Sequence, residues 1–119
     1  MSDSILKEKS YRFAIRVVRL NHYLCSEKSE YVLSRQLLRS GTAIGALVRE
    51  AEFGQSRADF RNKMSIALKE ANETDYWLNL LRDTGYISEK MFQSLSEDSL
   101  ELIRILVATV KTTQKPRKE

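Results

Sequence analysis

Two glycines four residues apart, Gly41 and Gly45, lie inside a segment whose apolar residues recur at helical spacing. The segment covers residues 33–52, and its apolar positions are Leu33, Leu37, Ile44, Val48 and Ala51. Glycine costs about 1 kcal/mol relative to alanine inside a helix, so two of them need a structural reason. Small residues let a neighbouring helix approach closely. We therefore predict that residues 33–52 form a helix packed at short range against its neighbours.

Three other segments show the same periodicity: residues 4–27, a segment from about 57 to 84, and one from about 89 to 110. The expected core of the first is Leu6, Phe13, Val17, Leu20 and Leu24, widened by Ile5, Ala14 and Val18. The other two contribute Phe60, Met64, Ala67, Leu68, Ala71, Thr74, Leu78, Leu81, Met91, Leu95, Leu102, Ile103, Leu106 and Val110. Because the links are short, the sequence predicts an all-α, antiparallel up-down-up-down four-helix bundle over residues 1–110. Residues 111–119 are polar and basic, so we expect a disordered tail there.

Local signals mark the expected helix ends. Ser29 is predicted to cap the second helix, and Ser56 with Asp59 resembles a capping box before the third. Gly85 can adopt the left-handed conformation that ends the third helix, and Ser88 is predicted to cap the fourth.

The segment 36–46, Gln-Leu-Leu-Arg-Ser-Gly-Thr-Ala-Ile-Gly-Ala, is followed by Glu-Ala-Glu at residues 50–52. Together with residues 59–60, 63–71 and 73–78, these stretches resemble the small four-helix-bundle proteins encoded in intervening sequences of bacterial 23S rRNA genes, the S23-type family. The same family includes the accessory protein of diversity-generating retroelements. The resemblance runs from about residue 9 to 110.

The chain has 119 residues, a net charge of +4, 30% charged residues and 42% hydrophobic residues, which is typical of one globular domain. A single cysteine, Cys25, excludes an internal disulfide and suits a reducing cytoplasm. No apolar run approaches the roughly 20 residues that span a bilayer, and the polar start does not resemble a signal peptide. We therefore expect a cytoplasmic protein.

Basic residues concentrate at the two ends of the chain. Residues 1–28 hold six Lys or Arg against three acids, and residues 111–119 hold four against one. In the first helix, Lys9, Arg12, Arg16 and Arg19 form a basic stripe at spacings of three and four, which Tyr23 continues. Glu8 has the spacing to form an ion pair with Arg12. The stripe is either a solvated helix face or a contact surface for phosphate or an acidic partner. The candidate nucleic-acid-binding residues are Lys9, Arg12, Arg16, Arg19, Lys115, Arg117 and Lys118.

A second group of residues suggests a subunit interface. The arginines of the second helix need acidic partners if they are partly buried, either on another helix or on a neighbouring subunit. The adjacent aromatic residues Tyr76 and Trp77 cannot both face one core. We therefore expect one of them inside the bundle and the other at a subunit boundary, and burial of both is the alternative. The candidate interface residues are Arg35, Arg39, Arg49, Tyr76 and Trp77.

The sequence offers little for catalysis. The only histidine, His22, has an arginine rather than an acid three residues before it, which argues against a di-metal bundle site, and one cysteine with one histidine does not predict zinc. The glycines at 41 and 45 lack the Gly-Lys-Ser/Thr ending of a phosphate-binding loop. Lys69 and Glu73 have the spacing of a surface ion pair rather than of an acid/base site. We therefore predict no enzyme, no metal and no cofactor.

The resemblance implies a homopentamer of side-by-side bundles. In the retroelement branch it implies a basic surface that binds nucleic acid and a reverse-transcriptase partner. Our first hypothesis is a non-enzymatic oligomeric module that binds RNA or DNA through phosphate contacts, with affinity that falls with salt. The alternative is a protein-interaction scaffold whose basic face docks an acidic protein such as a reverse transcriptase.

Overall fold

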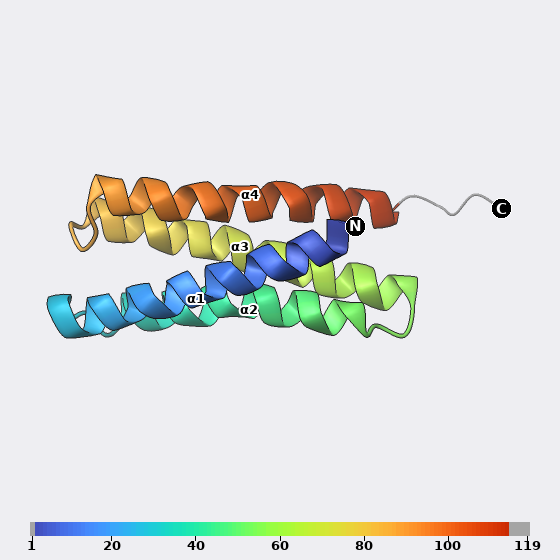
Figure 1. Ribbon diagram of the computed structural model, residues 1–119, viewed down its shortest axis with the longest axis horizontal. Coiled ribbons are helices and arrows are strands. Elements are labelled where there is room, and N and C mark those ends of the chain that lie inside the picture. The colour runs from blue at the N-terminus through green and yellow to red at the C-terminus, as the bar shows by residue number, and fades with distance from the viewer. Residues whose placement is uncertain (1, 115–119) are drawn as a thin grey trace.

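The computed structural model describes residues 2–114, except for the side chains of residues 2–4. Four helices account for most of these residues: α1 (Ser2–Lys28), α2 (Leu33–Glu52), α3 (Arg57–Asp83) and α4 (Glu89–Gln114). Successive helices run antiparallel and are joined by short links, as Figure 1 shows. Each helix contacts its two neighbours around the bundle, so α3 lies diagonally opposite α1. The predicted up-down-up-down four-helix bundle is confirmed.

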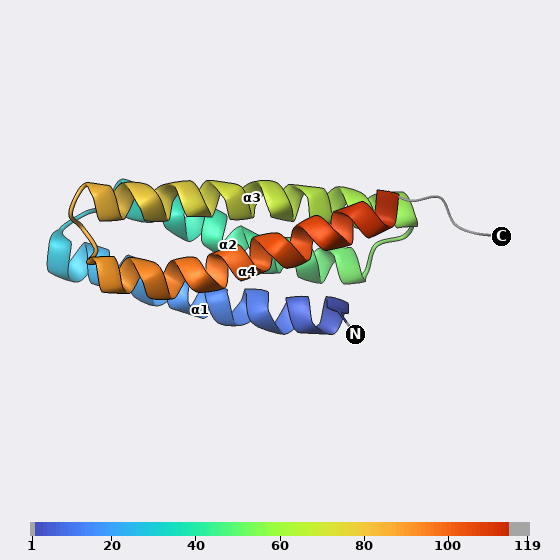
Figure 2. The same cartoon turned by 90° about the horizontal axis from the view of Figure 1, so that it is seen from above.

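The contact between α1 and α4 is the least extensive of the four. Figures 1 and 2 together show that these two helices cross at an angle instead of running parallel. Long side chains of α1, those of Lys9 and Arg16, bridge to acids of α4.

The fourth helix is longer than the sequence predicts. It continues past residue 110 to Gln114, and Thr113 is buried. The first four residues of the predicted tail are thus helical, and its remainder, residues 115–119, lies outside the described part of the chain.

The predicted core is buried or partly buried with two exceptions, both on α1. Ile5 is 49% exposed and Val18 is 37% exposed, so the prediction that they widen the core is wrong. Successive positions of a helix turn by about 100°, which carries Val18 away from the buried stripe that Val17 and Leu24 share. Apolar side chains consequently lie on two sides of α1.

Small residues of α2 let α1 approach closely. A Cβ atom placed on Gly41 would lie 2.7 Å from Cγ2 of Val17, and one on Gly45 would lie 3.3 Å from the carbonyl oxygen of Ser10. The first distance is a clash and the second is tight, so the prediction of short-range packing around these glycines is confirmed.

The cap of α2 differs from the prediction. Ser29 ends α1 with a positive φ of 51°, and the amide of Glu30 donates to the carbonyl of Leu24 at 2.9 Å, so Ser29 does not cap α2. The Glu30 carboxylate accepts from the amides of Leu33 at 3.0 Å and Ser34 at 2.7 Å instead. A longer side chain therefore reaches the free amides of α2 from one residue further along.

The other helix ends follow the sequence signals. The Ser56 hydroxyl accepts from the Asp59 amide at 3.0 Å, although the Asp59 carboxylate accepts from the Gln55 amide and not from that of Ser56. Gly85 has a φ of 84° after α3, and the Ser88 hydroxyl accepts from the Met91 amide at 3.1 Å. Among residues 2–114, no helix is long and apolar enough to span a lipid bilayer.

Candidate nucleic-acid interface

Two basic residues of the stripe bridge from α1 to acidic residues of α4. Nζ of Lys9 lies 3.2 Å from Oε1 of Glu101, and Nη1 of Arg16 lies 2.6 Å from Oδ2 of Asp98. The predicted pair within α1 also forms, with Nη2 of Arg12 at 2.8 Å from Glu8. Three of the four candidate phosphate-binding residues of α1 thus have a carboxylate partner in the same chain.

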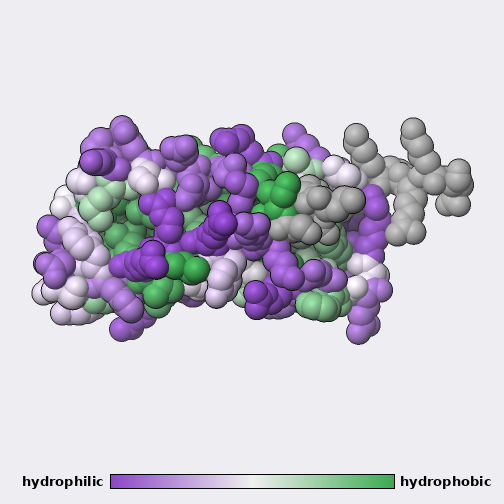
Figure 3. Space-filling view, in the orientation of Figure 1, coloured by the Kyte–Doolittle hydropathy of each residue, from purple (hydrophilic) through white to green (hydrophobic). Residues whose placement is uncertain are grey.

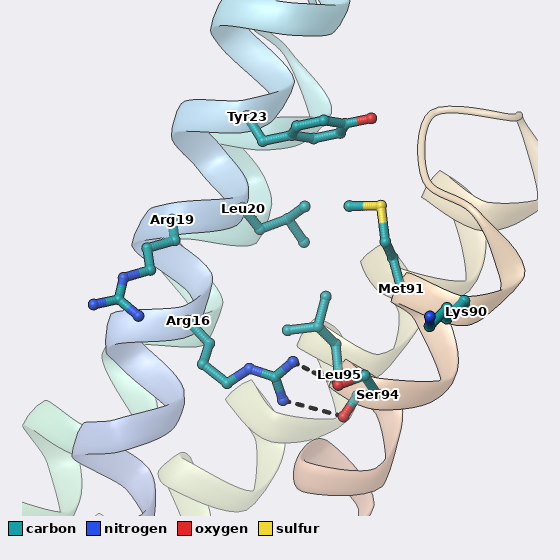
Figure 4. A pocket seen from close by; sticks show the side chains of 8 residues that line it. All are labelled: Arg16, Arg19, Leu20, Tyr23, Lys90, Met91, Ser94 and Leu95. Carbon is teal, nitrogen blue, oxygen red and sulfur yellow. Dashed lines mark hydrogen bonds between the residues drawn. The ribbon is translucent and has the colours of Figure 1, made fainter.

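Arg16 is the most tightly held of these residues. Besides the pair with Asp98, its guanidinium donates to the carbonyl oxygen of Ser94 at 3.1 Å and to the Ser94 hydroxyl at 2.7 Å. Figure 4 shows this bridge across the space between the helices. The side chain of Arg16 therefore acts as a link between α1 and α4.

Arg19 differs from the other members of the stripe. It is exposed, and no carboxylate of the described residues pairs with it. Lys90, in the first turn of α4, is likewise exposed and has no ion-pair partner among the described side chains. These two residues stand on opposite rims of a groove of about 450 Å³, which we call the α1–α4 groove.

The α1–α4 groove has an apolar floor and basic rims. Leu20 and Tyr23 of α1 face Met91 and Leu95 of α4, while Arg16 closes one end. In Figure 3, hydrophobic side chains lie open between hydrophilic ones at the end of the molecule where α1 finishes and α4 begins. No carboxylate of the described residues lines the groove. It therefore suits a ligand with an apolar part and a negative charge.

Lys115, Arg117 and Lys118, the other candidate nucleic-acid-binding residues, lie outside the described residues. The groove in turn contains residues that the sequence did not single out as a site. Lys90 and Ser94 carry no signal of their own, and Met91 was expected to be core. Their proximity to Tyr23 depends on how α4 is aligned with α1, which the pattern of a single helix does not reveal.

The outward side of α1 carries a second apolar stripe. Tyr11 is 57% exposed, Ile15 38% and Val18 37%, at the spacing of one helix face. Phe53, just after α2, is 76% exposed, and a shallow depression between α1 and α2 runs from Tyr11 to Phe53. We call Tyr11, Ile15 and Val18 the outer face of α1.

Arg39 pairs with acids of its own bundle. Its guanidinium contacts Glu70 at 3.2 Å and also Glu73, both on α3. The hydrogen bond to Glu73, reinforced by the charge of Glu70, raises the pKa of Arg39 against the opposing effect of burial. Glu73 is thereby occupied, and the predicted Lys69–Glu73 pair is replaced by this contact between helices.

The remaining interface candidates are divided between the bundle and its surface. Trp77 packs against the core, and its Nε1 donates to Glu73 at 3.2 Å, whereas Tyr76 is 58% exposed. The guanidinium carbon of Arg49 lies 5.8 Å from the ring centroid of Tyr11, and Arg35 is exposed. One aromatic of the adjacent pair is therefore packed inside and the other is open to solvent.

Side chains suited to metal binding do not gather within the described residues. No three His, Cys, Asp or Glu side chains there lie close enough together to hold a metal ion. His22 is exposed on α1.

Comparison with known proteins agrees with the fold. Residues 2–108 match the family described as 23S rRNA-intervening sequence protein. A crystal structure from Bacteroides thetaiotaomicron VPI-5482, of a protein with unknown function from the S23 ribosomal protein family, superimposes with a TM-score of 0.92 and 53% sequence identity. The match covers 93% of this chain and 99% of that chain. A search of curated proteins gave no match.

Proposed function

Because the chain belongs to the family of 23S rRNA-intervening sequence proteins, we propose that it is a non-enzymatic, oligomeric module that binds nucleic acid through the basic side of α1. The α1–α4 groove carries this proposal: Arg19 and Lys90 stand on its rims without carboxylate partners, and its described lining contains no acid. Cations without a carboxylate partner beside such a lining attract phosphate.

Lys9 and Arg16 support nucleic-acid binding less strongly than Arg19, because each already has a carboxylate partner. Lys9 and Arg16 are 41% and 35% exposed, so their pairs with α4 remain accessible to solvent. Exposed ion pairs are worth about 0–1 kcal/mol, and a phosphate group can therefore compete with the carboxylate for the same cation. Lys115, Arg117 and Lys118 add charge at the other end of the chain.

The oligomeric part of the proposal rests on the outer face of α1. A helix with apolar side chains on opposite sides is suited to a position between other elements, and one bundle covers only one of those sides. We propose that a second copy covers the other side and that the assembly is a homopentamer. The outer face lies on a different side of α1 from Arg16 and Tyr23, so this packing leaves the apolar floor of the groove open. Arg19 lies between the two sides and also lines a depression with Ile15 and Val18, so the second copy comes close to this rim of the groove.

The first test is a fluorescence-anisotropy titration with labelled structured RNA and duplex DNA at several salt concentrations. We expect binding in the micromolar range that weakens with salt, with a slope of log affinity against log salt of about 0.7–0.9 for each phosphate contact. Replacing both Arg19→Gln and Lys90→Gln should lower affinity roughly tenfold and reduce the slope by about two contacts. No salt-sensitive binding of either ligand would refute the proposal.

Two controls sharpen this result. Lys69→Gln removes an exposed lysine from α3, diagonal to α1, and should leave affinity within about twofold of wild type. Light scattering on the same sample should give five times the 13.8 kDa monomer mass, and Ile15→Glu should reduce it. A pentamer that binds no nucleic acid but captures an acidic protein through Arg19 and Lys90 would favour the scaffold function.

A further inference from the structure

The α1–α4 groove contains a flat aromatic face beside an apolar wall. Figure 4 shows the ring of Tyr23 above the space between Leu20 and Met91. Nζ of Lys28 lies 6.0 Å from the centroid of the same ring. The ring therefore combines a nearby cation with a face open toward the groove.

The positive charges lie at the rims and not on the floor. Lys90 stands at the α4 rim, and Arg19 stands at the α1 rim with its guanidinium directed away from the groove in Figure 4. Because Arg19 is exposed, its side chain can change rotamer quickly and reach an anion that passes along the rim. This arrangement fits a ligand whose charge stays outside while an uncharged flat ring enters.

We propose that the groove binds one unstacked base of a single-stranded nucleic acid, with the base on the ring of Tyr23 and the flanking phosphates on Arg19 and Lys90. The volume of about 450 Å³ falls within the roughly 300–1,000 Å³ of pockets that hold small organic groups. Single strands can turn a base outward onto an aromatic side chain, whereas a duplex keeps its bases stacked inside. The inference rests on the nucleic-acid binding proposed above and specifies the form of ligand.

An acidic amphipathic helix is the competing occupant of the groove. Such a helix inserts anchors at positions i, i+3 or i+4, and i+7, which span about 10.5 Å before the width of the side chains is added. Along α1, the distance from Tyr23 to the closing link at Arg16 is also seven residues, or about 10.5 Å. The two spans are equal, so length alone does not separate these ligands; the flat face of Tyr23 and the cations on both rims favour the base.

The test compares single-stranded RNA of about 12 nucleotides with the duplex of the same sequence, in anisotropy titrations of the full chain. Tyr23→Leu should weaken single-strand binding at least about fivefold while duplex binding changes by less than about twofold. Tyr23→Phe keeps the aromatic face and should retain single-strand affinity. Circular dichroism of both variants confirms that the bundle is folded.

A second measurement uses the unmodified protein, so it does not depend on the folding of a variant. Single-stranded RNA containing 4-thiouridine should cross-link on irradiation to peptides that contain Tyr23 or Met91. Cross-links confined to other regions would overturn the inference.

The outcomes separate the inference from the proposed function. Salt-sensitive binding of both ligands, with no effect of Tyr23→Leu, would overturn the inference and leave nucleic-acid binding in place. Binding of neither ligand would overturn both. An acidic amphipathic peptide that binds in a Tyr23-dependent manner, where single-stranded RNA does not, would replace the base with a protein partner.

Discussion

Nη1 of Arg16 lies 2.6 Å from Oδ2 of Asp98, so a cation of the basic stripe is held by the helix that forms the other wall of the α1–α4 groove. The side chain of Asp98 is 45% exposed. It therefore repels an approaching phosphate and also competes with it for Arg16. Asp98 therefore limits how far Arg16 is available to a ligand.

Asp98→Asn should strengthen nucleic-acid binding. The change removes a negative charge beside the groove and frees Arg16 for phosphate, and we expect a gain of about two- to fivefold at low salt. The cost in stability should stay below about 1 kcal/mol, because the pair is exposed. Glu97→Gln is the matched control: it removes the same charge one residue away, where no ion pair forms among the described side chains. An equal gain in both variants would show that only net charge matters.

Gly41→Ala should destabilise the bundle. The new Cβ would lie 2.7 Å from Cγ2 of Val17, and overpacking of this kind costs about 1–3 kcal/mol, which outweighs the gain of up to about 1 kcal/mol in helix propensity. Urea unfolding followed by circular dichroism measures the difference. In a Val17→Ala background the two shortest contacts are removed and only the contact with Cβ of residue 17, at 3.2 Å, remains, so the same glycine substitution should cost much less. An equally large destabilisation in this background would contradict the role of Val17.

The Glu30 cap should make stability depend on pH. Burial raises the pKa of the Glu30 carboxyl, but hydrogen bonds from the amides of Leu33, Ser34 and Val32 outweigh it, and the pKa is lowered from 4.5. A lowered folded-state pKa means that the stabilisation is fully present above about pH 4.5 and is lost as the pH falls through the folded-state value. Glu30→Gln should therefore lose about 1 kcal/mol of unfolding free energy at neutral pH and less at about pH 3.

The control for this prediction is Glu27→Gln, at an exposed position near the end of α1. Its unfolding free energy should follow that of the wild-type protein at both pH values. A Glu30→Gln deficit that is equally large in acid would rule out the carboxylate charge as its source.

Ser99→Ala should stabilise the protein. The Ser99 hydroxyl is fully buried on α4, and its oxygen has no hydrogen-bond partner among the described atoms. Removing an unsatisfied buried hydroxyl and gaining helix propensity should add about 0.5–2 kcal/mol to the unfolding free energy. By contrast, Ser40→Ala should cost about 1 kcal/mol, because the Ser40 hydroxyl lies 2.9 Å from that of Thr74. Thermal unfolding of both variants distinguishes the two serines.

The bundle itself could be predicted because its signals are local. The apolar spacing from Met64 to Leu81 defines one helix face, and Gly85 ends that helix through a conformation that glycine adopts easily. Ser29 was the wrong cap because a hydroxyl and a carboxylate one residue apart both offer acceptors, and the choice depends on the backbone at the end of α1.

The candidate site could be predicted only in part. Helical spacing puts Lys9 and Arg16 on one side of α1, but Lys9 meets an acid 92 residues later in the sequence. That pairing depends on how α1 and α4, which are far apart in the sequence, are aligned with each other. The spacing of residues within one helix gives no information on this alignment. For the same reason the sequence did not reveal that Tyr23 faces Met91. The exposure of Val18, by contrast, follows from the turn of about 100° per residue within α1, and the prediction was wrong because it widened the core stripe beyond that angle.

The sparse contact between α1 and α4 also has a kinetic consequence. It is the one helix contact that joins the two ends of the chain, while the other three join helices that follow one another in sequence. Contacts between successive helices require only short loops to close, so they can form early in folding. We therefore expect the bridges from Lys9 and Arg16 to form after the rate-limiting step, so that weakening them speeds unfolding and leaves the folding rate nearly unchanged.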